Sequence, residues 1–207
     1  MIAIIDYGVG NLYSLSSSLS YLGIPCAVTR SAEEIKAADK IILPGVGAFG
    51  DAFQKLKDTG LVPVVKEEAA NGKPLLGICL GMQLLFEEGF EYGRHEGLGL
   101  IPGSVCPLED DLKAAGLSLK VPHIGWNALD IRKKENPLMR YSKNGDFVYY
   151  VHSFYAKYCE ESIVATSEYG VNLVGTVARG SVYGCQFHPE KSGEVGLRIL
   201  RAFSEIA

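Results

Sequence analysis

Long apolar stretches are absent from this 207-residue sequence. A membrane-spanning helix needs about 20 consecutive apolar residues, so we expect none here. The start of the sequence lacks the basic residues that open a secretory signal peptide, and we expect a cytoplasmic protein. Excess positive charge is also missing, because 20 Lys and Arg are balanced by 24 Asp and Glu. A general nucleic-acid-binding protein, which needs clustered basic residues, is therefore not expected.

Cysteines at disulfide or metal-binding spacings are missing as well. The five cysteines are an odd number, and no two of them form a C-x-x-C pair. Neither a disulfide framework nor a zinc finger is predicted. We expect four of them to be chemically inert, namely Cys26, Cys106, Cys159 and Cys185. The content of 47% hydrophobic and 21% charged residues excludes disorder and a coiled coil, and the length fits one domain.

The first half of the sequence alternates between buried strands and amphipathic helices. Continuous apolar runs of this kind are typical of strands covered on both faces. The expected strands cover residues 2–5, 27–29, 40–43 and 74–78. The expected helices follow Asn11 and Ser31, precede Gly72, and span residues 82–88, with Asn11 and Ser31 as helix caps. This alternation predicts an α/β fold with a doubly wound, mostly parallel, flavodoxin-like sheet flanked by helices.

The second half is dominated by short β-type runs. They cover residues 121–129, 146–153, 163–168 and 174–177, with hairpin-like loops at residues 143–145 and 179–180. We interpret this half as an antiparallel extension of the main sheet and not as a separate domain. A last amphipathic helix begins near Ser192.

Cys79 lies between an apolar strand and an apparent helix, in the pattern Gly77-Ile-Cys79-Leu-Gly81. This is the thiol version of the nucleophile elbow, in which small residues two before and two after the nucleophile let the chain turn sharply. The start of a helix favours the thiolate form, and the backbone N–H of Leu80 could stabilise an oxyanion. The alternative is that Cys79 is a small buried residue at the end of a core strand.

A thiol nucleophile needs a base, and His188 is the one histidine with a carboxylate at an informative spacing. Pro189 pushes His188 toward extended geometry. In an extended segment, His188 and Glu190 project to the same side, so Glu190 could hold the imidazole while His188 takes the thiol proton. The alternative is an ordinary His and Glu on a solvated loop.

The loop Pro44-Gly45-Val46-Gly47 follows the third expected strand. Ligands collect at the carboxyl ends of parallel strands, where Cys79 also lies. Glycines on both sides of Val46 make reorientation of the peptide easy, which suits a second oxyanion donor. If the Val46 carbonyl occupies the oxyanion position at rest, the isolated protein would be nearly inactive until a partner binds. The alternative is an ordinary glycine-rich turn.

These motifs resemble those of the class I (triad) glutamine amidotransferases. Among them, the match is to the glutaminase subunits of imidazole glycerol phosphate synthase, and it covers nearly the whole chain as one domain, residues 1–207. The motifs occur in the order of that family. They are Asp6-Tyr-Gly-Val-Gly-Asn11, Pro44-Gly-Val-Gly-Ala-Phe-Gly50, Gly77-Ile-Cys-Leu-Gly-Met-Gln83, Met82-Gln-Leu-Leu-Phe86, His123-Ile-Gly-Trp-Asn127, Val151-His-Ser-Phe154 and Gln186-Phe-His-Pro-Glu-Lys-Ser192.

The resemblance implies a Cys-His-Glu triad that hydrolyses glutamine to glutamate and ammonia without a metal or organic cofactor. Cys79 would be the nucleophile, His188 the general base and acid, and Glu190 its orienting partner. An oxyanion hole would be formed by Leu80, Val46 and Gly47. The glutamine would be held by Gly47, Gln83, Glu91, Ser153 and Phe154.

The resemblance also implies a heterodimer with a (β/α)8-barrel cyclase. The cyclase would use the ammonia to form imidazole glycerol phosphate and an aminoimidazole carboxamide ribotide in histidine biosynthesis. Asn11, Trp126, Tyr149 and Lys191 would lie at or near the docking face. Aromatic residues are favoured as interface anchors, although a single Trp more often belongs to a core.

Three other functions stay open at this point. A flavodoxin-like binding module would use Gly8-Val-Gly10-Asn-Leu-Tyr13 as a phosphate loop, but Tyr13 stands where that motif needs glycine. A stand-alone cysteine hydrolase could use the same triad. Another class I amidotransferase, such as a pyridoxal phosphate synthase glutaminase, would serve a different acceptor.

Overall fold

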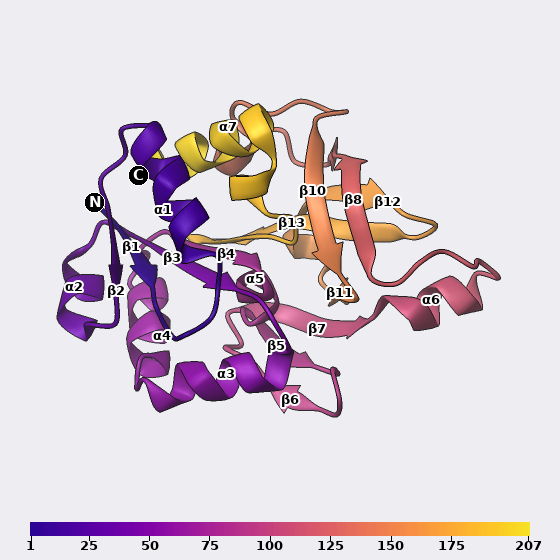
Figure 1. Ribbon diagram of the computed structural model, residues 1–207, viewed down its shortest axis with the longest axis horizontal. Helices are drawn as coiled ribbons and strands as arrows, with labels where there is room; N and C mark the ends of the chain where they lie inside the picture. The colour runs from indigo at the N-terminus through magenta and orange to yellow at the C-terminus, as the bar shows by residue number, and fades with distance from the viewer.

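The central sheet has eight strands in the spatial order β2-β1-β3-β4-β14-β13-β12-β9 (Figure 1). The computed structural model describes all residues, 1–207. The parallel strands are β1 (Ile2–Ile5), β2 (Cys26–Thr29), β3 (Lys40–Gly45), β4 (Leu75–Cys79) and β14 (Val182–Cys185). The antiparallel strands are β13 (Asn172–Arg179), β12 (Ile163–Glu168) and β9 (Asp130–Ile131). The predicted α/β fold with an antiparallel extension is confirmed.

Helices cover both faces of this sheet because alternate residues of a strand point to opposite sides. In β1, Ile2 and Ile4 belong to the core beneath α1 (Leu12–Tyr21) and α7 (Gly193–Ser204). Ala3 and Ile5 belong to the core of the other face. That face is covered by α2 (Ala32–Ala37), α3 (Phe49–Asp58) and α4 (Val62–Ala70). None of the helices is long and apolar enough to cross a membrane.

Two smaller sheets stand beside the central one, and the sequence did not predict them (Figure 1). The strands β8 (His123–Ala128) and β10 (Phe147–His152) pair only with each other, although both were expected to extend the main sheet. A four-stranded sheet joins β11 (Phe154–Lys157), β7 (Ile101–Pro107), β5 (Phe86–Gly89) and β6 (His95–Glu96). A short helix, α6 (Leu108–Ala114), follows β7.

The helix expected over residues 82–88 is wrong. The helix α5 (Leu80–Gln83) has four residues, and β5 begins at Phe86. Leu84, Leu85 and Phe86 are all fully buried. A continuous buried run fits a strand or a helix equally well. The parallel pairing of Phe86 with Ile101 makes this run a strand.

Two loop predictions also differ. The helix expected up to Gly72 is divided into α3 and α4, because Gly60 takes a φ of +73° and turns the chain between them. The loop at residues 143–145 precedes β10, but β10 pairs with β8, so this loop closes no hairpin. The loop at residues 179–180 does join the paired strands β13 and β14.

The carboxyl ends of three adjacent parallel strands meet at one edge of the central sheet. Gly45 at the end of β3 is the register partner of Cys79 at the end of β4. Cys185 at the end of β14 is paired with Ile78, and the chain continues from there to His188. Parallel topology therefore brings the glycine loop, Cys79 and His188 to the same place.

Candidate active site

Cys79 occupies a strained turn between β4 and α5. Its φ of 55° and ψ of −113° lie in a region that residues with a side chain rarely adopt. A Cβ at Gly81 would lie 1.8 Å from the Leu43 carbonyl oxygen, and one at Gly77 would lie 2.6 Å from the Gly81 oxygen. The two glycines of the motif are therefore required sterically, as the sequence predicted. The turn presents the sulfur to the adjoining pocket.

His188 and Glu190 form a buried pair. His188 Nδ1 lies 2.8 Å from Glu190 Oε1, and the side chains are 3% and 2% exposed. His188 is extended, with φ −98° and ψ 101°, but Pro189–Lys191 form a 3₁₀ turn, η3. Glu190 thus reaches the imidazole through a tight turn and not, as expected, along an extended segment. The backbone N–H of His188 donates to the Tyr149 carbonyl, which fixes the segment against β10.

The charge state of His188 follows from its neighbours. Burial lowers its pKa, but the interactions with Cys79 and with Glu190 outweigh burial and raise the pKa to about 10. The imidazole is therefore held as a cation beside the sulfur. Such a cation favours the thiolate, which is the nucleophilic form of cysteine.

Asn11 supports the same pair, contrary to its expected role as a helix cap. It stands at the N-cap of α1, but its side chain makes no capping hydrogen bond. Instead, its Nδ2 donates to Glu190 Oε1 at 3.3 Å. The other carboxylate oxygen, Glu190 Oε2, is buried without a partner. Ser31, in contrast, caps α2 as predicted by accepting a hydrogen bond from the Glu34 N–H.

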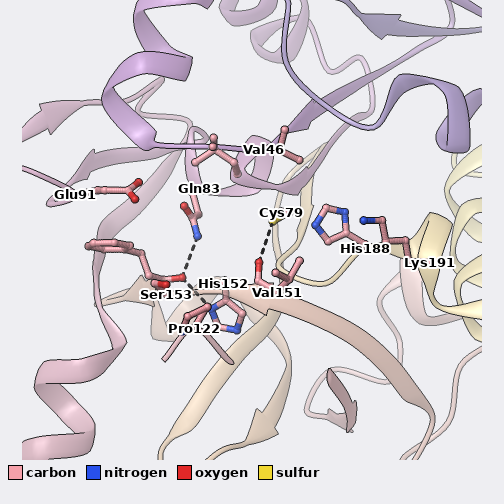
Figure 2. Close-up of a pocket in the computed structure, with 13 residues that line it drawn as sticks. Val46, Cys79, Gln83, Glu91, Pro122, Val151, His152, Ser153, His188 and Lys191 are labelled. Carbon is pink, nitrogen blue, oxygen red and sulfur yellow. Dashed lines mark hydrogen bonds between the residues drawn. The ribbon is translucent and has the colours of Figure 1, made fainter. Parts of the chain in front are cut away.

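A pocket of about 330 Å³ adjoins Cys79 (Figure 2). Its size is at the lower end of the range for small-molecule sites. All five residues predicted to hold glutamine line it, as do the expected oxyanion residues, Cys79, His188 and Lys191. Pro122, Val151 and His152 also line it, and no role was derived for Pro122 from the sequence. Glu190 does not reach this pocket and lies behind His188.

Gln83 and His152 are oriented by one backbone carbonyl. Phe154 O accepts hydrogen bonds from Gln83 Nε2 at 3.0 Å and from His152 Nδ1 at 3.0 Å. Gln83 Nε2 also donates to Gln186 Oε1 at 3.0 Å. Both amide hydrogens of Gln83 are therefore used, and only its Oε1 remains for a ligand. Figure 2 shows the Gln83 nitrogen on its dashed hydrogen bond and the oxygen on the other side of the amide.

The expected oxyanion donors line the same pocket as Cys79. Leu80 is the first residue of α5, so its N–H has no partner within the helix. Gly47 has a φ of +97° with open space around it, as a movable peptide requires. On the rim, Glu91 Oε2 accepts the N–H of Phe49, the first residue of α3, at 2.7 Å. Nowhere do three or more His, Cys, Asp or Glu side chains form a metal-binding group.

Comparisons with known proteins identify the family of the chain. A family model described as glutamine amidotransferase class-I matches residues 3–206. The imidazole glycerol phosphate synthase subunit HisH of Bacillus licheniformis is 52% identical over 206 residues, covering 99% of this chain and 96% of the relative. The subunit of the same name from Listeria monocytogenes is 50% identical over 206 residues, with coverages of 100% and 96%.

Solved structures show the same fold at low sequence identity. A glutamine amidotransferase crystal structure has a TM-score of 0.74 at 20% identity, covering 98% of this chain and 97% of that chain. PurLQS from Thermotoga maritima has a TM-score of 0.74 at 19% identity, with coverages of 98% and 96%. At these identities the likeness supports the fold alone.

The chain belongs to the class I glutamine amidotransferases. Within that class, it is a member of the family of imidazole glycerol phosphate synthase subunits named HisH, and so a glutamine-hydrolysing enzyme subunit. The binding-module alternative and the pyridoxal phosphate synthase alternative are thereby set aside.

Proposed function

We propose that Cys79, His188 and Glu190 hydrolyse glutamine to glutamate and ammonia in the pocket beside the β4–α5 turn. The observation that supports this proposal best is that the strained Cys79 turn faces the same pocket as His188, whose imidazole is paired with the buried Glu190 behind it. Strain at a single non-glycine residue is costly and is typical of a functional position.

In the first half of the reaction, the Cys79 thiolate attacks the carbon of the substrate's side-chain amide. A carbon–sulfur bond forms and the amide oxygen takes up negative charge, which the N–H groups of Leu80 and Gly47 stabilise. His188, held as a cation, gives its proton to the amide nitrogen. The carbon–nitrogen bond then breaks, and ammonia leaves a γ-glutamyl thioester on Cys79.

In the second half, the now neutral His188 accepts a proton from water, which attacks the thioester carbon. The carbon–sulfur bond breaks, and glutamate leaves with the Cys79 thiolate restored. Glu190 and Asn11 are positioning residues in both halves, because they keep His188 Nδ1 paired while the other ring nitrogen exchanges the proton.

The substrate is placed by polar groups around the pocket. Since Gln83 has only its Oε1 free, it accepts a hydrogen bond from an N–H of the substrate. The Glu91 carboxylate on the rim supplies the negative charge that an α-ammonium group needs. Ser153, which connects β10 to β11, and Phe154, the first residue of β11, also line the pocket and complete this placement.

The ammonia goes to a cyclase partner with a (β/α)8-barrel form, as the HisH family membership suggests. An exposed apolar surface on the β8–β10 ribbon supports docking next to the pocket. Ile124, Trp126 and Phe147 are 59%, 55% and 55% exposed, which is unusual for such large apolar side chains. Tyr149 is the cross-strand partner of Trp126, with ring centroids 6.0 Å apart.

The docking surface is continuous with the active site. Along β10, alternate residues share a face, so Phe147, Tyr149 and Val151 lie on one side of the ribbon. Val151 lines the pocket, and Lys191 lines it from the His188 side. Figure 2 shows Lys191 next to His188. A partner covering this surface would close the pocket and receive the ammonia directly.

The test is glutamine hydrolysis by the chain combined with a candidate cyclase, with and without the cyclase's ribotide substrate. Wild-type protein should release ammonia, and Cys79→Ala should release none while its circular dichroism spectrum and melting temperature stay close to wild type. Undiminished hydrolysis by Cys79→Ala would disprove the triad. A glutamine-analogue electrophile should label Cys79 stoichiometrically, whereas peptide-like electrophiles should not, which separates this function from that of a peptidase.

A further inference from the structure

Gln186 is a buried residue of the Gln186-Phe-His-Pro-Glu-Lys-Ser192 motif to which the reaction above gives no role. It has no exposed surface. Its backbone N–H donates to the Gly175 carbonyl, which fixes it to the neighbouring strand β13. Its side-chain Nε2 lies 3.8 Å from the Cys79 sulfur. We infer that Gln186 is a further catalytic residue, whose amide N–H stabilises the Cys79 thiolate; this rests on the proposed function.

The orientation of the Gln186 amide follows from its neighbours and not from its shape alone. Phe154 O is a backbone carbonyl and can only accept, so the Gln83 atom facing it is the nitrogen. The same nitrogen faces the Gln186 amide, so the Gln186 atom that meets it is the oxygen. The nitrogen of Gln186 is therefore the atom turned toward the sulfur.

The same carbonyl orients two histidines on the other side. His152 Nδ1 must be an N–H, because it faces Phe154 O at 3.0 Å. His152 Nε2 then accepts from His123 Nδ1, which lies 3.1 Å away. Burial lowers the pKa of each ring to about 4, so both are neutral at physiological pH. The donors His152 and Gln83 thus converge on Phe154 O and hold it in place, and Gln83 in turn holds the amide of Gln186.

A hydrogen-bond donor at this position would stabilise the thiolate form of Cys79, whose other neighbours do so only in part. The sulfur also lies 3.9 Å from the Val151 carbonyl oxygen, an acceptor that favours the neutral thiol. The helix α5 has only four residues, so its backbone dipoles are fewer than the sequence suggested. His188 supplies a positive charge on one side, and the Gln186 N–H supplies a second donor. The long distance is typical of catalytic contacts before substrate binds.

The experiment measures alkylation of Cys79 by iodoacetamide as a function of pH, read from the mass of the Cys79 peptide. Only the thiolate reacts, so the rate reports its population. Gln186→Met removes the donor at similar volume. Gln186→Glu keeps an acceptor for Gln83 but replaces the donor by a carboxylate. Both should move the midpoint of the pH profile upward by about one unit and slow alkylation at pH 7 about tenfold.

Hydrolysis of glutamine by the variants with the cyclase provides the second readout. We expect kcat/KM to fall about tenfold at pH 7 and to recover toward wild type at higher pH, where the thiolate forms without help. A purely structural defect would lower the rate at every pH. Gln54→Glu and Gln54→Met, the same changes on the exposed face of α3, should leave both profiles unchanged.

The two possible failures are distinguishable. If wild-type protein hydrolyses glutamine and both Gln186 variants keep the wild-type alkylation profile, the role of Gln186 is disproved and the triad stands. If Cys79 of the wild-type complex is neither alkylated nor needed for hydrolysis, the proposed function itself fails. Melting temperatures of both variants identify any unfolding, and the Glu variant preserves the hydrogen bond to Gln83 if the Met variant does not fold.

Discussion

At the scale of single residues, Glu190 is a carboxyl group that is shielded from solvent. Its Oε1 is shared by His188 and Asn11, and its Oε2 has no partner. A buried carboxylate in this state is costly unless it serves a neighbouring cation. Its interaction with the imidazole contributes to the high pKa of His188, and it fixes which ring nitrogen faces the sulfur.

We therefore expect Glu190→Gln to lower kcat for glutamine hydrolysis by roughly 10³-fold, since the neutral amide neither supports the cation nor selects the tautomer. Steady-state kinetics of the complex would measure this. Glu194→Gln, on an exposed position in the first turn of α7, is the matched control and should be neutral. A Glu190→Gln enzyme with wild-type kcat would show that His188 needs no orienting carboxylate.

The roles of single residues could be predicted from the sequence where all the interacting residues belong to one local motif. The G-x-C-x-G spacing by itself indicates that the sharp turn at Cys79 needs small residues on both sides. His188 and Glu190 are two positions apart, so their pairing could also be predicted locally. Gln186 and Asn11 act through contacts with residues 107 and 179 positions away, respectively. No local pattern contains such contacts, so their roles became visible only in the folded chain.

At the scale of elements, Gly81 in the β4–α5 turn and Gly72 between α4 and β4 differ in what surrounds them. Gly81 is packed against β3, with a Cβ position 1.8 Å from the Leu43 oxygen. Gly72 has a φ of +86°, but nothing lies within 4 Å of its Cβ position. A side chain at Gly72 would therefore be unfavourable only because of the backbone conformation. A side chain at Gly81 would also have to displace the neighbouring strand β3.

We expect Gly81→Ala to lower the free energy of unfolding by about 3 kcal/mol or more, from overpacking. Gly72→Ala should cost about 1–2 kcal/mol, from its left-handed backbone alone. Urea denaturation of the two variants measures the difference. Equal losses would mean that the turn relaxes away from β3 and is less rigid than its packing indicates.

The two histidines at the start of β8 and the end of β10 make the ribbon sensitive to acid. His123 is stacked between Tyr150 and Tyr169 and bonded to His152. Burial lowers the pKa of both imidazoles to about 4. The two imidazoles bind protons near pH 6.5 in the unfolded chain, but only near pH 4 in the folded chain. Stability is therefore full above pH 6.5 and falls as the pH drops from 6.5 toward 4.

Together the two imidazoles should contribute a few kcal/mol to this acid loss, at about 1.4 kcal/mol per pKa unit. His123→Phe keeps the aromatic stacking without a titratable group, so its melting temperature should fall less steeply between pH 7 and pH 4.5 than that of wild type. Thermal melts at several pH values give the slopes. His95→Gln, on a half-exposed histidine of β6, should keep the wild-type slope. An unchanged slope in His123→Phe would mean that His123 is already charged in the folded protein.

The elements of the central sheet were predictable because burial on both faces leaves continuous apolar runs, as in β1 and β4. The short elements were not. The run from Leu84 to Phe86 is apolar in every position, so nothing local separates a helix from β5. Its strand identity comes from pairing with Ile101, and pairing between distant segments is a property of the whole fold.

At the scale of the whole molecule, the β8–β10 ribbon forms its own sheet and displays large apolar side chains to solvent. The sequence indicated strands there, but it did not show that they would leave the main sheet. The ribbon is a sheet separate from the central one, and Trp126 and Phe147 on it are exposed to solvent. Exposed aromatic clusters of this kind are typical of interaction surfaces.

If the cyclase docks on this face, Trp126 should be a binding hot spot. Loss of a buried interface tryptophan typically costs 2 kcal/mol or more, so Trp126→Ala should weaken the complex roughly 30-fold, as measured by isothermal titration with the cyclase. Tyr158→Ala removes another exposed aromatic residue outside the ribbon and should leave the affinity unchanged. Equal affinities of wild type and Trp126→Ala for the cyclase would show that the cyclase docks on another surface. The pocket would then need another route for ammonia, because the ribbon's outer face and the pocket wall share strand β10.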